Sequence, residues 1–101
     1  LITIVALVSP LAAERQQARA IVGPERFVEI HCDAPLEVCE ARDQDGLYAR
    51  ARAGEITNVT GVDAPYEAPA APEIRLDTAK DGLAANLERV LAALRSRGLL
   101  G

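Results

Sequence analysis

Aromatic side chains are scarce in this sequence of 101 residues, which contains no Trp and only Phe27, Tyr48 and Tyr66. Half of the residues are hydrophobic, so the apolar side chains are mainly aliphatic. This composition suits helices packed on a parallel sheet better than an aromatic-rich β-sandwich. A chain of this length builds one modest core, which limits it to one domain or part of one.

Positive charge is also sparse. Eleven Lys and Arg residues stand against fifteen Asp and Glu residues, and no run of five basic residues occurs. A net charge of −4 excludes a general attraction to nucleic acid or to an acidic membrane. The apolar residues 1–8 lack a basic flank and are fewer than the roughly 20 residues that span a bilayer. We therefore expect a cytoplasmic protein with no nucleic-acid or membrane partner.

Cysteine and histidine are too few for a zinc site. Cys32 and Cys39 are the two cysteines, and the single His31 is not placed at zinc spacing from them. Free cysteines prefer protein interiors. We expect two buried, reduced thiols and no metal ligands.

The apolar opening of the chain predicts a buried strand followed by a helix. Residues 1–8 are apolar at seven of eight positions, which is typical of a central parallel strand. Ser9 offers an N-cap hydroxyl, and Pro10 suits the first helical position. We expect a helix over residues 10–22, closed by Gly23. The chain opens on Leu directly in a core strand, so we also expect it to be a fragment.

Further strands and helices alternate along the chain. Residues 27–32 predict a strand, and residues 33–41 begin with Asp-Ala-Pro and predict a short helix. Residues 73–77 alternate as a last strand, and residues 83–98 predict an amphipathic helix that ends at a glycine. Consecutive strand–helix units form right-handed crossovers. The predicted class is α/β, with a parallel sheet and flanking helices.

Residues 42–72 interrupt this pattern with prolines, glycines and mixed charge around helical turns at 47–53. The segment is longer than a simple crossover needs, which predicts a mobile, lid-like insertion. Ligands of open α/β sheets bind beyond the carboxyl ends of the strands, where this sequence carries Ser9, Asp33 and Asp77. Three strands cover a sheet poorly, so we expect a further strand to pair beside residues 1–8.

Residues 7–15 read LVSPLAAER, residues 37–43 read EVCEARD, and residues 46–67 read GLYARARAGEITNVTGVDAPYE. These three motifs resemble those of the adenylylsulfate (APS) kinases. The first is similar to the family pattern FISP(Y/H)xx(D/E)R, the second is identical to the family's, and the third resembles GLYKKARAGEIxxFTGIDxPYE. The resemblance spans essentially the whole chain. It implies a P-loop nucleoside triphosphate hydrolase-like fold, of which residues 1–101 form the C-terminal part of one domain with a lid at about 42–72.

The resemblance also implies an activity of sulfate assimilation. APS kinases transfer the γ-phosphoryl group of ATP, with Mg²⁺, to the 3′-hydroxyl of APS and produce 3′-phosphoadenylyl sulfate. The implied partners are APS, a second copy in a homodimer, and a fused or associated ATP sulfurylase.

Site residues follow from the same resemblance. Ser9 is expected to line the APS site and to be the catalytic serine of a phosphoryl-enzyme intermediate, although direct in-line transfer needs only positioning and charge neutralisation. Arg42 ends a helix, where its guanidinium can stack on adenine, bind phosphate or merely offset the helix dipole. The predicted substrate-binding residues are Val8, Ser9, Pro10, Val59, Thr60 and Gly61, and the predicted ATP-binding residues are Arg42, Arg50 and Arg52.

Three positions depart from the family pattern. Asp45 replaces a lysine, Ala49 replaces another, and Val59 replaces a phenylalanine that stacks on the APS adenine. The first two changes weaken the electrostatics of the lid. The third removes a stacking contact of about 1–3 kcal/mol, unless Val59 packs inward.

No Gly-x-x-x-x-Gly-Lys-Ser/Thr motif occurs in the sequence, so no phosphate cradle of that kind is present. We therefore expect the chain alone to be inactive. Two alternatives stay open at this point. One is a non-catalytic, truncated or degenerate nucleotide-binding module, and the other is a different small-molecule P-loop kinase, which would not predict the segment at 46–67.

Overall fold

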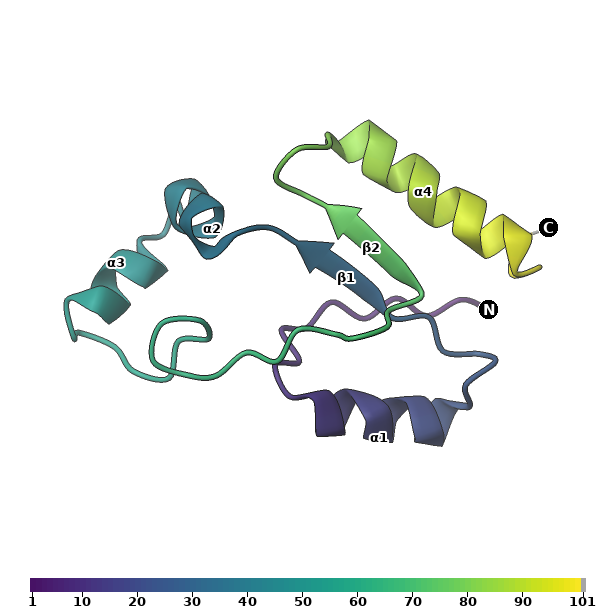
Figure 1. Cartoon of the computed structure of the whole chain (residues 1–101), viewed down its shortest axis with the longest axis horizontal. Coiled ribbons are helices and arrows are strands. Elements are labelled where there is room, and N and C mark those ends of the chain that lie inside the picture. The colour runs from purple at the N-terminus through teal and green to yellow at the C-terminus, as the bar shows by residue number, and fades with distance from the viewer. Residues whose placement is uncertain (101) are drawn as a thin grey trace.

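The computed structural model describes residues 1–100 (Figure 1). In this part of the chain a two-stranded parallel sheet is combined with four helices, which confirms the α/β class. The elements in chain order are α1 (Ala12–Val22), β1 (Ile30–Asp33), α2 (Leu36–Arg42), α3 (Leu47–Arg52), β2 (Ile74–Asp77) and α4 (Leu83–Ser96).

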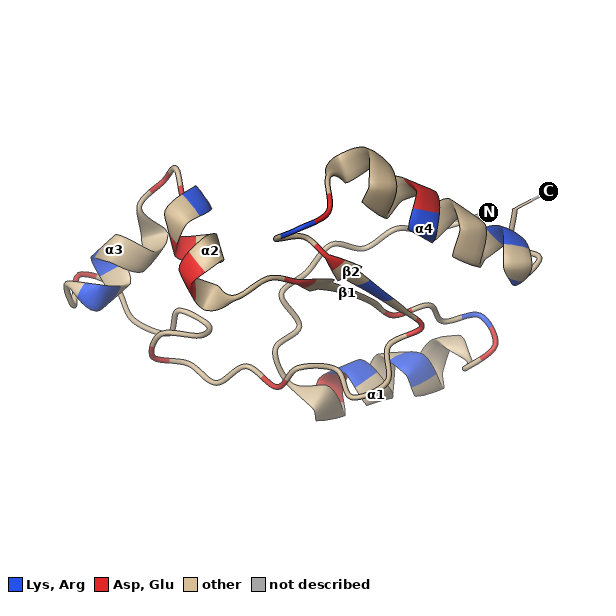
Figure 2. Cartoon of the chain, turned by 45° about the horizontal axis from the view of Figure 1, so that its top comes forward, with Lys and Arg blue, Asp and Glu red and all other residues tan. Residues whose placement is uncertain are grey.

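The two strands pair in parallel, with Ile30 opposite Ile74 and Asp33 opposite Asp77. Their carboxyl ends therefore meet at one edge of the sheet. Helices α1 and α4 lie on opposite sides of the strands, whereas α2 and α3 lie beyond the carboxyl ends (Figures 1 and 2). The long connection from β1 to β2 thus carries α2, α3 and most of the 42–72 insertion to the edge where ligands bind in such sheets.

The core of the described chain is small. Within residues 1–100, only Val59, Ile74 and Leu76 are buried hydrophobic residues, with 6–8% of their surface exposed. The radius of gyration is 15.5 Å, against about 13 Å for a compact domain of 100 residues. Much apolar surface therefore remains open to solvent.

The expected central strand over residues 1–8 is wrong for this structure. The segment has no regular secondary structure, and Leu1, Ile4 and Val5 are exposed by 70–123%. A strand exists only through pairing with a neighbour, and neither β1 nor β2 pairs with this segment within residues 1–100.

Helix α1 begins at Ala12 rather than at Pro10, and Ser9 does not cap it. An N-cap residue has an extended backbone, whereas Ser9 has a φ of 43°. The side chain of Glu67 takes over this role, because its Oε1 accepts the Ala12 N–H at 2.8 Å. Helices α3 and α4 and strand β2 agree with the predictions to within two residues, whereas α2 and β1 each begin three residues later than predicted.

Both cysteines are free, but the expected burial is wrong for Cys32, which is exposed, and Cys39 is half-buried. Cys32 shares one face of β1 with the exposed Ile30, and no element covers that face among the described residues. No helix within residues 1–100 has the length and apolarity needed to cross a membrane.

Candidate functional site

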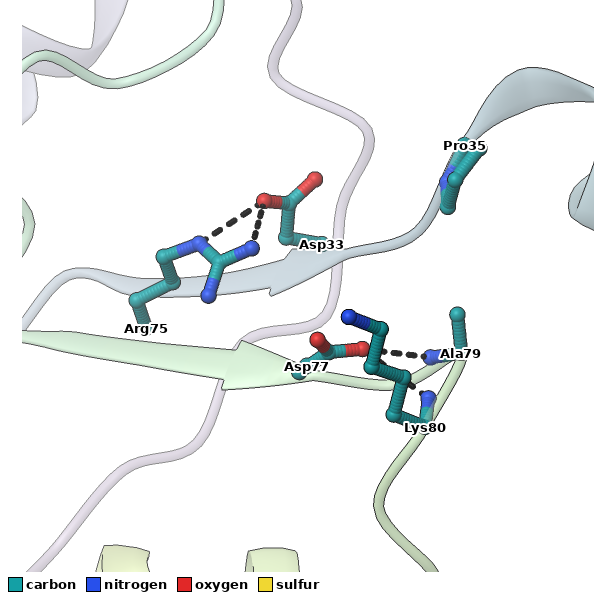
Figure 3. A pocket seen from close by; sticks show the side chains of 6 residues that line it. All are labelled: Asp33, Pro35, Arg75, Asp77, Ala79 and Lys80. Carbon is teal, nitrogen blue, oxygen red and sulfur yellow. Dashed lines mark hydrogen bonds and ion pairs between the residues drawn. The ribbon is translucent and has the colours of Figure 1, made fainter.

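A hollow of about 300 Å³ lies at the carboxyl edge of the sheet (Figure 3). Arg75 Nε donates to Asp33 Oδ2 at 2.8 Å, so the two strands are joined by an ion pair at this edge. Asp77 Oδ1 accepts the backbone N–H groups of Lys80 at 2.9 Å and Ala79 at 3.1 Å. The bond from Lys80 is the main cause that lowers the pKa of Asp77. The hollow is lined by Asp33, Pro35, Arg75, Asp77, Ala79 and Lys80.

Thr78 connects this edge to the end of α2. Its N–H and Oγ1 both donate to the Asp33 carbonyl, at 2.9 and 3.1 Å. Its own carbonyl accepts a bond of 2.8 Å from Arg42 Nη1. The guanidinium of Arg42 therefore lies where α2 ends beside the loop after β2, at the edge that the sequence predicted.

Ser9 is held in a strained conformation. Its φ of 43° is in the left-handed region, which costs about 1–2 kcal/mol for a residue with a Cβ. Such residues persist only where their surroundings fix them, and they are frequent at functional sites. Here the Ser9 carbonyl accepts a bond of 2.6 Å from Arg15 Nη1.

Glu67 fastens the end of the 42–72 insertion to the turn at Ser9 and Pro10. Its N–H donates to the Pro10 carbonyl at 2.8 Å, and its carbonyl accepts a bond from Arg15 Nη2. Together with the cap on Ala12, these bonds bring residues more than fifty positions apart in the sequence into one turn.

A network of four charged side chains continues from Arg15 along α1, whose basic residues can be followed in Figure 2. Arg15 Nε lies 3.4 Å from Glu29, and Arg19 pairs with Glu73 at 2.9 Å and with Glu29 at 3.9 Å. These side chains are only 9–17% exposed. Arg19 also lies 4.8 Å from the centre of the Phe27 ring. The network anchors α1 to the starts of both strands.

Sequence reasoning missed this network. Arg15 and Arg19 are four residues apart and so share one helix face, and each acidic partner comes just before a strand. That spacing was the available signal, but the pairing of residue 19 with residue 73 depends on the fold.

The Val59 side chain packs inward, since only 8% of the residue's surface is exposed to solvent. The Asp63 carboxylate holds the loop by accepting the N–H groups of Asn58 at 2.8 Å and Val59 at 2.6 Å. Gly61 has a φ of 88°, and a Cβ there would lie 3.2 Å from Leu36 Cδ1. The loop is therefore tightly built, and contact of Val59 with a substrate base stays a prediction.

The cations on α3 have partners within the chain. Arg52 forms an ion pair with Glu40 of α2, and this hydrogen bond is the main cause that lowers the pKa of Glu40. Arg50 Nη2 donates to the Asp45 carbonyl at 3.5 Å. Each guanidinium has five N–H donors and both residues are exposed, so these contacts leave donors that a phosphate group could still bind.

The structure places the predicted site residues in four groups. Val8, Ser9 and Pro10 lie at the turn held by Arg15, and Val59, Thr60 and Gly61 lie in the loop held by Asp63. Arg42 lies at the sheet edge, and Arg50 and Arg52 lie on α3. Within residues 1–100 no hydrogen bond or ion pair joins Ser9 to Thr60, Gly61 or these three arginines. The four groups thus need a common ligand or further protein to act together.

The described residues do not fit a magnesium site of their own. No group of three or more acidic, histidine or cysteine side chains could hold a metal ion within residues 1–100. The carboxylates at the sheet edge, Asp33 and Asp77, already bind Arg75 and two backbone N–H groups. We derive no step through a metal ion from these residues.

Known proteins resemble this chain along most of its length. The family model of adenylylsulphate kinase matches residues 1–77. An adenylyl-sulfate kinase of Aeromonas hydrophila is 53% identical over 99% of this chain and 51% of its own length. One of Lactiplantibacillus plantarum is 53% identical over 89% of this chain and 44% of its own. The bifunctional enzyme NodQ of Azospirillum brasilense is 48% identical over 98% of this chain but only 16% of its own length.

A solved structure agrees with these relatives. The Mycobacterium tuberculosis APS kinase CysC, in complex with AMPPNP and APS, matches with a TM-score of 0.81 at 42% identity. The match covers 88% of this chain and 52% of that protein. The chain thus spans about half the length of the kinases it matches. Given the family match over residues 1–77 and this structural agreement, the chain belongs to the adenylylsulphate kinase family.

Proposed function

We propose that this chain is the C-terminal part of an ATP-dependent adenylylsulfate kinase. The complete enzyme would transfer the γ-phosphoryl group of ATP to the 3′-hydroxyl of APS and release ADP and 3′-phosphoadenylyl sulfate. The observation that carries the proposal is the match over 88% of the chain to a kinase whose structure contains AMPPNP and APS.

The local geometry supports a substrate subsite at Ser9. The residue follows the apolar segment 1–8 and lies three residues before α1, in a backbone conformation that its surroundings must hold. Residues in such conformations are frequent at functional sites. We therefore propose that Val8, Ser9 and Pro10 bind the APS end of the reaction, with Ser9 as the catalytic candidate.

The nucleotide is proposed to bind at the sheet edge. Arg42 lies there and is exposed, so its planar guanidinium is accessible to an adenine ring or a phosphate. ATP with Mg²⁺ would supply the transferred group. Because the sequence lacks the glycine-rich phosphate loop, the chain's own residues position the two ends of the reaction but do not cradle the β- and γ-phosphates.

The cellular context is part of the same proposal. We place the enzyme in the cytoplasm, with APS as substrate and with a homodimer or an attached ATP sulfurylase as assembly. The match to NodQ, which is described as bifunctional and extends far beyond the matched part, supports a fused arrangement.

A chimera tests the proposal. Residues 1–100 of this chain replace the matched half of the Aeromonas hydrophila kinase, so that the relative supplies the phosphate loop. We expect APS-dependent formation of ADP, which a coupled assay measures. The parent enzyme is the positive control, and the parent with a mutated phosphate-loop lysine is the negative control. A folded chimera that forms no more ADP than the negative control would contradict the proposal.

A second candidate is a nucleotide-binding module without catalysis. It is favoured by Asp45 and Ala49, which stand where the family pattern has lysines and so leave fewer cations in the lid for a triphosphate. The same chimera separates the two, because this module would bind ATP without forming ADP.

A further inference from the structure

We propose that Arg15 is a positioning residue of the APS subsite. Its guanidinium holds Ser9 in the left-handed conformation and fastens Glu67, near the end of the 42–72 insertion, to the turn at Ser9 and Pro10. The inference rests on the proposed function, since it gives Arg15 a task at the proposed substrate site.

Arg15 reaches three separate segments at once. Nη1 donates to the Ser9 carbonyl at 2.6 Å, Nη2 donates to the Glu67 carbonyl, and Nε lies 3.4 Å from Glu29 Oε2. The side chain is only 9% exposed. All three guanidinium nitrogens of Arg15 therefore have a partner, and the three partners belong to segments that are far apart in the sequence or precede different elements.

This geometry suits an arginine. A guanidinium is planar and presents its donors in fixed directions, whereas a lysine ammonium is compact and sits on a flexible stem. A lysine at position 15 could keep the ion pair with Glu29. It would lack the two fixed terminal nitrogens that donate separately to the Ser9 and Glu67 carbonyls.

Glu67 provides the other half of the fastening. Its N–H binds the Pro10 carbonyl and its Oε1 caps Ala12, both at 2.8 Å. The position of the insertion's end is thereby tied to the conformation of Ser9. A change at Arg15 should alter both together.

Arg19 is a matched control on the same helix face. It is similarly buried, at 17% exposure, and it also pairs with Glu29. Its other partner is Glu73, and it has no bond to Ser9 or Glu67 within residues 1–100. Substitution of Arg19 therefore removes ion pairs with Glu73 and Glu29 but leaves the hydrogen bonds of Ser9 and Glu67 in place.

Nuclear magnetic resonance of the 101-residue chain tests the positioning directly. The one-bond Cα–Hα coupling of Ser9 reports the sign of its φ, and hydrogen exchange reports the Glu67 N–H. In Arg15→Lys we expect the positive-φ signature to be lost and the Glu67 amide to exchange at least about tenfold faster. Arg19→Lys should change neither. An unchanged Ser9 coupling and unchanged exchange in Arg15→Lys would overturn the proposal.

A second measurement decides the matter if Arg15→Lys folds poorly. Glycine adopts a positive φ without strain, so in a Ser9→Gly background the substitution at Arg15 should lower Tm by less than in the original chain. An equal loss of Tm in both backgrounds would mean that Arg15 stabilises the fold without holding Ser9.

The chimera adds a functional readout. Arg15→Lys should raise the KM for APS about tenfold and leave the KM for ATP unchanged, whereas Arg19→Lys should change neither. Equal changes in both constants would contradict a role at the APS subsite. If the unsubstituted chimera is inactive, the proposed function fails, but the Ser9 coupling still decides whether Arg15 positions the turn.

Discussion

Single residues set the most constrained points of this chain. Ser9 occupies a left-handed backbone conformation that Arg15 holds from the side, and Val59 is buried in a loop that the Asp63 carboxylate organises. One predicted substrate segment is therefore accessible but strained, and the other is anchored in the small core. The two segments should respond differently to substitution.

Enlarging Val59 tests its burial. Because its side chain is 8% exposed, we expect Val59→Phe to overpack the loop and to lower the free energy of unfolding by about 1–3 kcal/mol. Urea unfolding measures the change, and Val62→Phe, at a half-buried position of the same loop, is the control. An unchanged stability together with roughly tenfold tighter APS binding in the chimera would instead support stacking of the ring on the substrate base.

Glu73 predicts a dependence of stability on acid. Burial disfavours its ionised form, but hydrogen bonds from Arg19 and from the Glu29 N–H outweigh this and lower its pKa. A lowered folded-state pKa gives stability that is present above the ordinary carboxyl pKa and is lost as the pH falls through the folded value. We therefore expect Glu73→Gln to cost about 1–3 kcal/mol at pH 7 and progressively less on acidification.

Unfolding titrations between pH 7 and pH 3 check this sign. Glu88→Gln, at an exposed position on α4, is the matched control and should leave the acid dependence unchanged. A constant difference between Glu73→Gln and the original chain at every pH would show that the Glu73 charge has no part in it.

At the level of elements, the helices are fixed by their ends. Helix α1 is attached at its start by Glu67 and along its side by the charged network, and α2 is attached at its end by the bond from Arg42 to Thr78. These attachments place one helix beside the proposed APS turn and the other at the sheet edge.

Arg42 is the last residue of α2 and is proposed to contact the nucleotide. In the chimera, Arg42→Ala should raise the KM for ATP more than the KM for APS. The reason is that the Arg42 guanidinium binds the Thr78 carbonyl at the sheet edge, and within residues 1–100 no hydrogen bond joins it to Ser9. Steady-state kinetics with each substrate varied in turn measure this. If Arg42 only offsets the dipole of α2, the substitution should leave both KM values unchanged and cost a few tenths of a kcal/mol, up to about 1 kcal/mol, of stability.

The whole molecule is open rather than compact. Its radius of gyration is 15.5 Å, its largest extent is 48 Å, and apolar side chains of residues 1–8, α1 and α4 are exposed. Large exposed apolar patches mark interaction surfaces in soluble proteins. In the chimera, the relative's half is expected to cover part of it.

The isolated chain should therefore be inactive and should bind apolar dyes. No group in the sequence can cradle the β- and γ-phosphates, so we expect no APS-dependent ADP formation above background. Dye fluorescence should be high for the chain and several-fold lower per molecule for the chimera. Detectable APS-dependent turnover by the chain alone would show that its site is more complete than proposed.

The sequence by itself determined the family motifs, the α/β class and most element bounds. Helical periodicity, the glycines at 23 and 98 and the alternation at 73–77 are local signals, so α4 and β2 could be predicted closely. Arg42 could likewise be placed at a helix end near the carboxyl edge of the sheet, because the order of strands and helices dictates that position.

The tertiary structure decided what depends on partners far along the chain. Residues 1–8 have the composition of a strand, but a strand needs a paired neighbour, and none pairs with them within residues 1–100. The left-handed Ser9, its fastening by Arg15 and Glu67, and the burial of Val59 arise from contacts between distant segments. Local pattern cannot specify such contacts, because they exist only once the fold brings their atoms together.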